Sequence, residues 1–131
     1  MGWIAYFTVF VVAHLVGDFA LQTDFQAVHK HFGLGRDPVA RRALFTHLAT
    51  YSLPIVGACV WIASVRPAAW TVVVGAIVLV EHLIQDDGRL LIAYCRRVKH
   101  FEADEQPGIF VWVDQTFHVL ALFGAALLLT V

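Results

Sequence analysis

The stretch IFVWVDQTFHVLALFGAALLLTV, residues 109–131, is an apolar run long enough to cross the hydrocarbon core of a bilayer. It nevertheless contains a carboxylate and an imidazole, Asp114 and His118, one helical turn apart. Ionisable side chains at membrane depth cost free energy and usually have a function, so this segment predicts both a membrane-spanning helix and a site. The same spacing of histidine and aspartate recurs in two other apolar segments, at His14/Asp18 and at His82/Asp86.

The composition of the whole chain agrees with a membrane location. The chain has 131 residues and is 60% hydrophobic, whereas a soluble domain is about 45–50% apolar. An integral membrane chain this short is expected to be a single domain, residues 1–131. Only 15% of the residues are charged and the net charge is −1. No basic surface is available to neutralise several phosphates, which excludes nucleic acid as a partner.

Four apolar segments predict an all-α membrane protein, a bundle of four transmembrane helices. Their approximate bounds are residues 3–21, 43–65, 69–95 and 109–131. The polar connection 22–42 repeats Phe25, Val28 and Phe32 at helical spacing, which predicts a short helix lying in the membrane interface. The third helix either runs on to residue 95 or breaks near Gly88 into a second interfacial piece.

The N-terminus and the two cysteines give no sign of other processing or redox chemistry. Met1-Gly-Trp3 lacks the basic region of a signal peptide, so the first apolar segment is expected to remain as a helix. Cys59 and Cys95 lie in different segments without Cys-x-x-Cys spacing and are interpreted as buried small hydrophobic residues.

Basic residues predict the orientation of the helices. The first and third connections hold the basic clusters, whereas the second holds only Arg66. By the positive-inside rule, the first and third connections are cytoplasmic and both termini are outside. With that orientation, each helix carries an ionisable residue near its cytoplasmic end: Asp18, His47, Asp86 and Asp114.

The three pairs also share one spatial order. Two helices run inward and read His-x-x-x-Asp, whereas the fourth runs outward and reads Asp-x-x-x-His. Each histidine therefore lies about 5.4 Å deeper than its aspartate. Residues four apart share a helix face, so all pairs can point into the bundle. The predicted site comprises His14, Asp18, His47, His82, Asp86, Asp114 and His118.

Imidazoles and carboxylates together suit one or two divalent transition metal ions such as Zn²⁺, Mn²⁺ or Fe²⁺. A bound ion would offset the cost of burying the carboxylates and activate a water for hydrolysis. Asp18, Asp86 and Asp114 are the candidate catalytic residues, one of them remaining unligated as a general base. Two alternatives stay open: interhelical hydrogen bonds with a structural role, and haem, which the neighbouring aspartates disfavour.

Several polar residues near the site have less certain roles. Gln22 and Gln115 can orient the metal ligands by hydrogen bonds from around the site. Tyr51 can donate a hydrogen bond to the site or form one between two helices. Glu81 and Gln85 either support the site or face another helix, and the arginines of the cytoplasmic connections can clamp a lipid phosphate. His29, His31 and His100 are expected to be solvated. Small residues such as Gly17, Gly57 and Gly75 permit close helix approach, so a homo-oligomer is possible.

The spacing His14-Leu-Val-Gly-Asp18-Phe-Ala-Leu-Gln22, followed by His47, His82-Leu-Ile-Gln-Asp86 and Asp114-Gln-x-x-His118, resembles the bacterial membrane proteins grouped as domain of unknown function 3307. The resemblance covers nearly the whole chain and implies a location in the bacterial inner membrane, but no activity. A looser resemblance to membrane-bound metal-dependent hydrolases implies a metal and a hydrolytic reaction.

The predicted function is metal-dependent hydrolysis of a lipid-linked or amphipathic substrate, because the site lies at the depth of inner-leaflet headgroups and phosphates. Membrane lipids and a lipid-linked phosphate are the expected partners. The alternative is a non-enzymatic membrane protein, either a component of metal or proton transport or an interaction subunit with a polar structural core.

Overall fold

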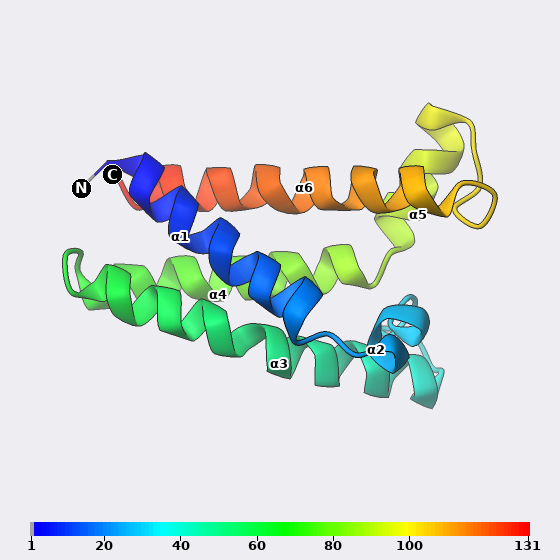
Figure 1. The fold of residues 1–131 in the computed structure, drawn as a ribbon, viewed down its shortest axis with the longest axis horizontal. Helices are drawn as coiled ribbons and strands as arrows, with labels where there is room; N and C mark the ends of the chain where they lie inside the picture. The colour runs from blue at the N-terminus through cyan, green and yellow to red at the C-terminus, as the bar shows by residue number, and fades with distance from the viewer. Residues whose placement is uncertain (1) are drawn as a thin grey trace.

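In the computed structural model, which describes residues 2–131, the chain is helical and these residues contain no strand. Four long elements cross the molecule, and shorter helices follow the first and the third of them along the chain (Figure 1). In chain order the elements are α1 (Trp3–Leu15) continued by the π-helical turn η1 (Val16–Ala20), α2 (Asp24–His29), α3 (Pro38–Ala63), α4 (Ala68–Asp86), α5 (Arg89–Tyr94) continued by η2 (Cys95–Lys99), and α6 (Pro107–Leu128).

The long elements form the predicted bundle of four helices. Trp3–Ala20, Pro38–Ala63, Ala68–Asp86 and Pro107–Leu128 are each long and apolar enough to cross a membrane. α1 packs on α3 and α6, and α4 packs on the same two helices, so each long helix has two neighbours. Both termini lie at one end of the bundle, and α2 and α5 lie at the other (Figure 1). The predicted fold class is confirmed.

The main differences between the observed and the predicted helices occur at three places. The third helix does not continue to residue 95: α4 ends at Asp86, Gly88 has a left-handed φ of 78°, and α5 starts at Arg89. The break near Gly88 is therefore the correct alternative. The second helix begins at Pro38 rather than near residue 43, because Asp37 caps it by accepting a hydrogen bond from the Val39 amide at 2.9 Å. The first helix ends in a π-helical turn that the sequence did not predict.

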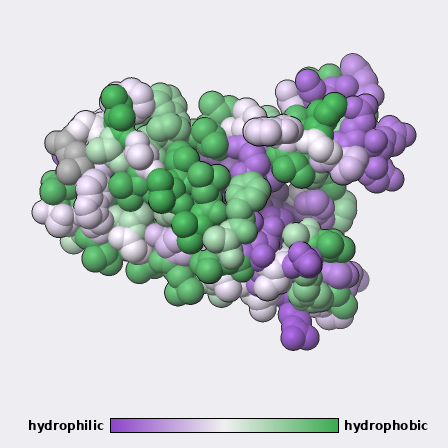
Figure 2. All heavy atoms as spheres, viewed as in Figure 1, coloured by the Kyte–Doolittle hydropathy of each residue, from purple (hydrophilic) through white to green (hydrophobic). Residues whose placement is uncertain are grey.

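The apolar core fills the half of the bundle nearer the termini. Its largest buried side chains include Tyr6, Phe10, Ile55, Ile62 and Leu122. The outer surface of the same half is also apolar, whereas hydrophilic residues gather at the end that carries α2 and α5 (Figure 2). An apolar exterior around an apolar core is what a bilayer requires, and it leaves the other half of the interior for polar side chains.

The connection between α2 and α3 packs against α3 through Gly33, which yields a testable prediction. A Cβ at Gly33 would lie 2.5 Å from Leu44 Cβ and 2.7 Å from the Ala40 carbonyl oxygen. We expect Gly33→Ala to destabilise the protein by about 1–3 kcal/mol, because neither atom can move without shifting α3.

Gly57→Ala is the matched control, since a Cβ there meets nothing within 4 Å. It is expected to be neutral or slightly stabilising, because alanine favours a helix over glycine. Thermal unfolding of both variants in one detergent checks the pair. Equal melting temperatures for both variants would contradict the close packing at Gly33.

Candidate metal centre

Seven ionisable side chains from the four long elements converge in the polar half of the bundle. Three overlapping groups have donor atoms that all lie within 4.8 Å of one another. The groups are His14/His82/His118, Asp18/His47/His82/Asp86 and Asp86/Asp114/His118. Every member is buried except Asp114, whose side chain is 17% exposed. The structure therefore brings together all seven residues that the sequence proposed.

Asp86 lies at the centre of the cluster. Its Oδ2 is 2.9 Å from His47 Nε2 and 3.2 Å from His82 Nε2, and its Oδ1 is 3.3 Å from His118 Nε2. Asp18 contacts the same histidine, His47, and its Oδ1 lies 3.2 Å from His47 Nε2. Since Asp86 belongs to two of the three donor groups, the arrangement has room for one ion or for two neighbouring ions that share this carboxylate.

The local backbone helps to direct Asp18 into the cluster. Asp18 lies within η1, where the Leu21 amide donates to the Val16 carbonyl oxygen at 3.0 Å. A π-helical turn inserts an extra residue into the helix and rotates the following side chains, and such turns are frequent at functional sites. Within this turn Asp18 faces α3 and α4, because its Oδ1 lies 3.2 Å from His47 Nε2 and 3.6 Å from His82 Nε2.

Two residues with uncertain roles in the sequence now have contacts with the cluster. Gln115 Oε1 lies 2.9 Å from His14 Nε2, and its Nε2 donates to Asp18 and Asp114, each at 3.3 Å. The Tyr51 ring stacks on the His82 ring, with centroids 3.4 Å apart and planes inclined by 4°. Both contacts restrict the orientation of groups that would bind a metal.

Tyr51 and Gln22 complete the shell around the histidines. The Tyr51 hydroxyl lies 3.1 Å from His14 Nδ1, so it contacts two of the cluster histidines through different atoms. The Gln22 amide nitrogen lies 3.2 Å from His47 Nε2. Polar groups at these positions stabilise one orientation of each imidazole.

Lys30 is a member of the cluster that the sequence does not predict. As one of the basic residues of the first connection it indicates only orientation, but its Nζ lies 2.8 Å from Asp86 Oδ2 and the residue is 8% exposed. The segment after α2 is held against the α4–α5 junction, because the amides of Phe32 and Leu34 donate to the carbonyl and carboxylate oxygens of Asp87 at 2.7 Å. This docking brings the ammonium of Lys30 to the cluster.

With neutral histidines, the charges of the cluster do not balance. Three carboxylates, those of Asp18, Asp86 and Asp114, face one ammonium, that of Lys30. With neutral histidines, two negative charges remain in a buried region. An unbalanced buried charge is costly unless a cation compensates it.

Buried polar atoms point to the same requirement. His82 Nδ1 makes no hydrogen bond among the described residues, and the nearest polar atoms to Asp18 Oδ1 and Asp86 Oδ1 are imidazole nitrogens at 3.2 and 3.3 Å. A buried acceptor or donor without a partner costs about 1–3 kcal/mol. Carboxylate oxygen and imidazole nitrogen are the donors that Zn²⁺, Mn²⁺ and Fe²⁺ accept. The donor set therefore fits a divalent metal.

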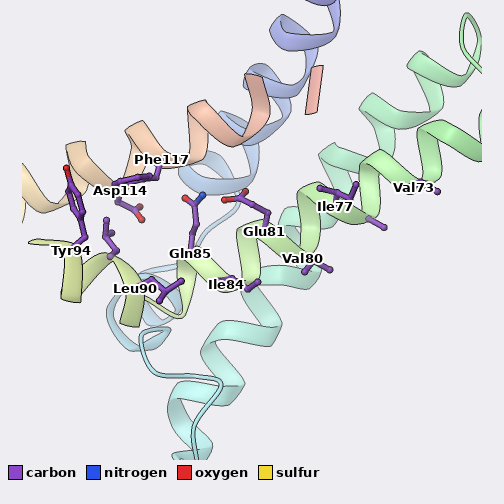
Figure 3. A pocket seen from close by; sticks show the side chains of 12 residues that line it. Val73, Ile77, Val80, Glu81, Ile84, Gln85, Leu90, Tyr94, Asp114 and Phe117 are labelled. Atoms are coloured by element: carbon purple, nitrogen blue, oxygen red, sulfur yellow. The ribbon is translucent and has the colours of Figure 1, made fainter. Parts of the chain in front are cut away.

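Three polar side chains line a groove beside the cluster. Glu81 and Gln85 rise from α4 towards α6, and Asp114 points back towards them (Figure 3). The groove has a volume of about 800 Å³ and is otherwise lined by apolar side chains and Tyr94. Glu81 and Gln85 thus line an open surface feature, whereas Asp114 belongs both to this groove and to a donor group of the cluster.

The three histidines outside the cluster differ in their exposure to solvent. His29 and His100 are exposed, in agreement with their predicted solvation. His31 is instead half-buried, because it packs over Gly88 and edge-on to the Phe110 ring at a centroid distance of 5.7 Å. Burial lowers the pKa of His31 below its usual value, and the neighbouring charge of Lys30 acts in the same direction.

Comparison with known proteins gives one match. A family model described as a protein of unknown function, DUF3307, matches residues 6–131. The match spans all four long helices and every residue of the cluster. No curated protein and no solved structure matches the chain.

Proposed function

The chain belongs to the DUF3307 family of proteins of unknown function, and we propose that it is a membrane metalloenzyme that hydrolyses a lipid-linked or amphipathic substrate. The observation that carries this proposal is the convergence of three aspartates and four histidines inside the bundle. With the histidines neutral and Lys30 protonated, the two remaining negative charges and the four imidazoles match the charge and donor preference of one divalent transition metal ion. Zn²⁺, Mn²⁺ and Fe²⁺ are the candidate ions.

The proposed roles follow from burial. Asp18 and Asp86 are shielded from solvent and from the groove, so they serve as ligands together with His14, His47, His82 and His118. Asp114 reaches the groove, so it is the candidate general base. A bound metal would supply positive charge and a water of lowered pKa at this position.

The proposed location is the cytoplasmic side of a bacterial inner membrane. The end of the bundle that carries α2, α5 and the start of α3 (Figure 1) holds most of the basic residues, including Arg41, Arg42, Arg89, Arg96 and Arg97. By the positive-inside rule this end is cytoplasmic, with both termini outside. A substrate with a headgroup or phosphate at that depth would reach the cluster without crossing the bilayer.

A non-enzymatic role is the second candidate, because Lys30 already pairs with Asp86 at 2.8 Å. If protonated histidines supplied the remaining positive charge, the cluster would be a metal-free polar core that specifies helix pairing or carries protons. Homo-oligomerisation through the exposed helix faces would accompany such a role.

Elemental analysis of protein purified in detergent distinguishes the two candidates. An enzyme of the proposed kind should contain close to one or two transition metal ions per chain, and chelation should lower its melting temperature because metal bound to the folded state stabilises it. With the metal restored, it should release product from a panel of lipid esters and lipid phosphates. Metal-free protein with a melting temperature insensitive to chelator would establish the polar core instead.

Lys30→Met makes a separate prediction about affinity. The ammonium competes with a cation for Asp86 Oδ2, so its removal is expected to tighten metal binding by about tenfold, which corresponds to about 1.4 kcal/mol of lost repulsion. The metal-free variant should at the same time be less stable, because Asp86 loses its partner. Calorimetric titration with Zn²⁺ or Mn²⁺ measures the affinity, and thermal unfolding of the metal-free protein measures the stability. Weaker metal binding by Lys30→Met would contradict the assignment of Asp86 as a metal ligand.

A further inference from the structure

The groove beside the metal centre combines an apolar stripe with a group of three polar side chains. Val73, Ile77 and Val80 form one stripe of α4 along the groove, and they are 44–57% exposed. The stripe lies on a helix that is long and apolar enough to span a membrane, so the groove opens towards lipid chains. From Val73 to Glu81 the stripe rises about 12 Å along the helix axis.

The polar side chains of the groove offer hydrogen-bond acceptors to a ligand. They are Glu81, Gln85 and Asp114, which lie between the apolar stripe on one side and Leu90 and Tyr94 on the other (Figure 3). No lysine or arginine lines the groove in residues 2–131, and Gln85 Oε1 is buried without a hydrogen-bond partner among these residues. Asp114 also belongs to a donor group with Asp86 and His118, so these polar side chains adjoin the metal centre.

We infer that this groove binds the hydrocarbon chain of an amphiphile whose head donates hydrogen bonds, through a hydroxyl or ammonium group, to Glu81, Gln85 and Asp114. The chain lies along Val73, Ile77 and Val80. The identification of this amphiphile as the substrate rests on the proposed function. A phosphate on the same molecule has to lie at the metal centre, because the groove offers it no cation.

A second copy of this chain fits the groove less well. A two-fold interface brings each surface patch against itself. Copies meeting through the groove would place the carboxylates of Glu81 and Asp114 near those of the partner, with no lysine or arginine from either groove lining to separate them. Like charges in a water-poor interface repel strongly, whereas a lipid with a donor head satisfies the same oxygens.

Photolabelling in lipid nanodiscs tests the inference directly. Three diazirine probes share a hexadecyl chain and carry an alcohol, an ammonium or a phosphate head, and labelled peptides are mapped by mass spectrometry. The alcohol and ammonium probes are expected to label the segments of α4 and α6 that line the groove about tenfold more than the phosphate probe does, a difference of about 1.4 kcal/mol.

The matched variants are Val80→Trp and Val72→Trp, both at exposed valines of α4, of which only Val80 lines the groove. Val80→Trp narrows the groove and is expected to reduce labelling about tenfold, a loss of about 1.4 kcal/mol. Val72→Trp is expected to leave labelling unchanged. Thermal unfolding verifies that both variants fold. If either variant does not fold, the labelling of the wild-type protein by the three probes still tests the inference.

Three results would overturn the inference: uniform labelling of all lipid-facing helices, preference for the phosphate probe, or cross-links between two copies through α4 without chain labelling. The experiment is performed with and without chelator. Labelling needs neither metal nor turnover. Absence of a metal would therefore disprove the proposed enzyme while leaving the groove assignment testable. Failure of the labelling would likewise disprove the groove assignment while leaving the metal centre testable.

Discussion

Asp86→Asn is expected to abolish metal binding, reducing the metal content of the purified protein to less than about a tenth of the wild-type value. Asp86 contacts His47, His82 and His118 and belongs to two of the three donor groups. Asparagine retains the shape of the side chain but not the charge that a divalent ion requires. Elemental analysis after purification in detergent measures the effect.

The same substitution should also destabilise the fold. It leaves the buried ammonium of Lys30 without its partner, and breaking a buried ion pair from one side costs about 3–5 kcal/mol. The double variant Lys30→Met/Asp86→Asn removes both charges and should recover most of that stability without recovering metal. This separation of stability from metal content distinguishes a ligand from a merely structural carboxylate.

Asp104→Asn is the matched control, because the same chemical change is made at an exposed turn. It should alter neither metal content nor melting temperature. If Asp86→Asn retained the full complement of metal, the assignment of the centre would be wrong, whatever its effect on stability.

The sequence predicted the bundle and the convergence of the pairs for a simple physical reason. Hydropathy and length define helices that cross a bilayer, and a spacing of four residues places His14 with Asp18 on one helix face. Once the four helices pack side by side, groups at one height on their inner faces must meet. Position along each helix was sufficient to predict the cluster.

Lys30, η1 and the groove depend instead on the path of the chain in three dimensions. Lys30 lies in a polar connection, where a cation is usually solvated, and only the docking of the following residues on Asp87 brings it inward. The π-helical turn that directs Asp18 has no sequence signal comparable to proline or glycine. The groove is lined by residues of α4, α5 and α6, which come together only after the chain breaks at Gly88 between α4 and α5.

Asp114 differs from the other two aspartates in ways that bear on catalysis. Its side chain is 17% exposed, compared with 3% for Asp18 and 1% for Asp86. It lines the groove and accepts a hydrogen bond from Gln115 at 3.3 Å. A general base has to reach the water or hydroxyl from which it takes a proton, whereas a buried ligand does not.

Asp114→Asn is therefore expected to slow hydrolysis by about 10²–10⁴-fold while the protein retains its metal. The asparagine can still accept a hydrogen bond from Gln115, so the surrounding geometry should be preserved, but it cannot take up a proton. The rate is measured at saturating metal with the lipid substrate found in the panel, and metal content is measured on the same sample. Formate added to Asp114→Ala should restore part of the rate, because a small carboxylate can enter from the groove.

The alternative outcome assigns Asp114 a different role. It belongs to a donor group with Asp86 and His118, so a ligand role predicts that Asp114→Asn loses metal and activity together and that formate restores neither. Loss of activity with metal retained identifies the base, and joint loss identifies a ligand. An unchanged rate would contradict both roles and would leave Asp18 and Asp86, which are buried away from the groove, as the remaining carboxylates of the centre. Since neither of them reaches the groove, hydrolysis would then have to proceed without a carboxylate of this chain as its base.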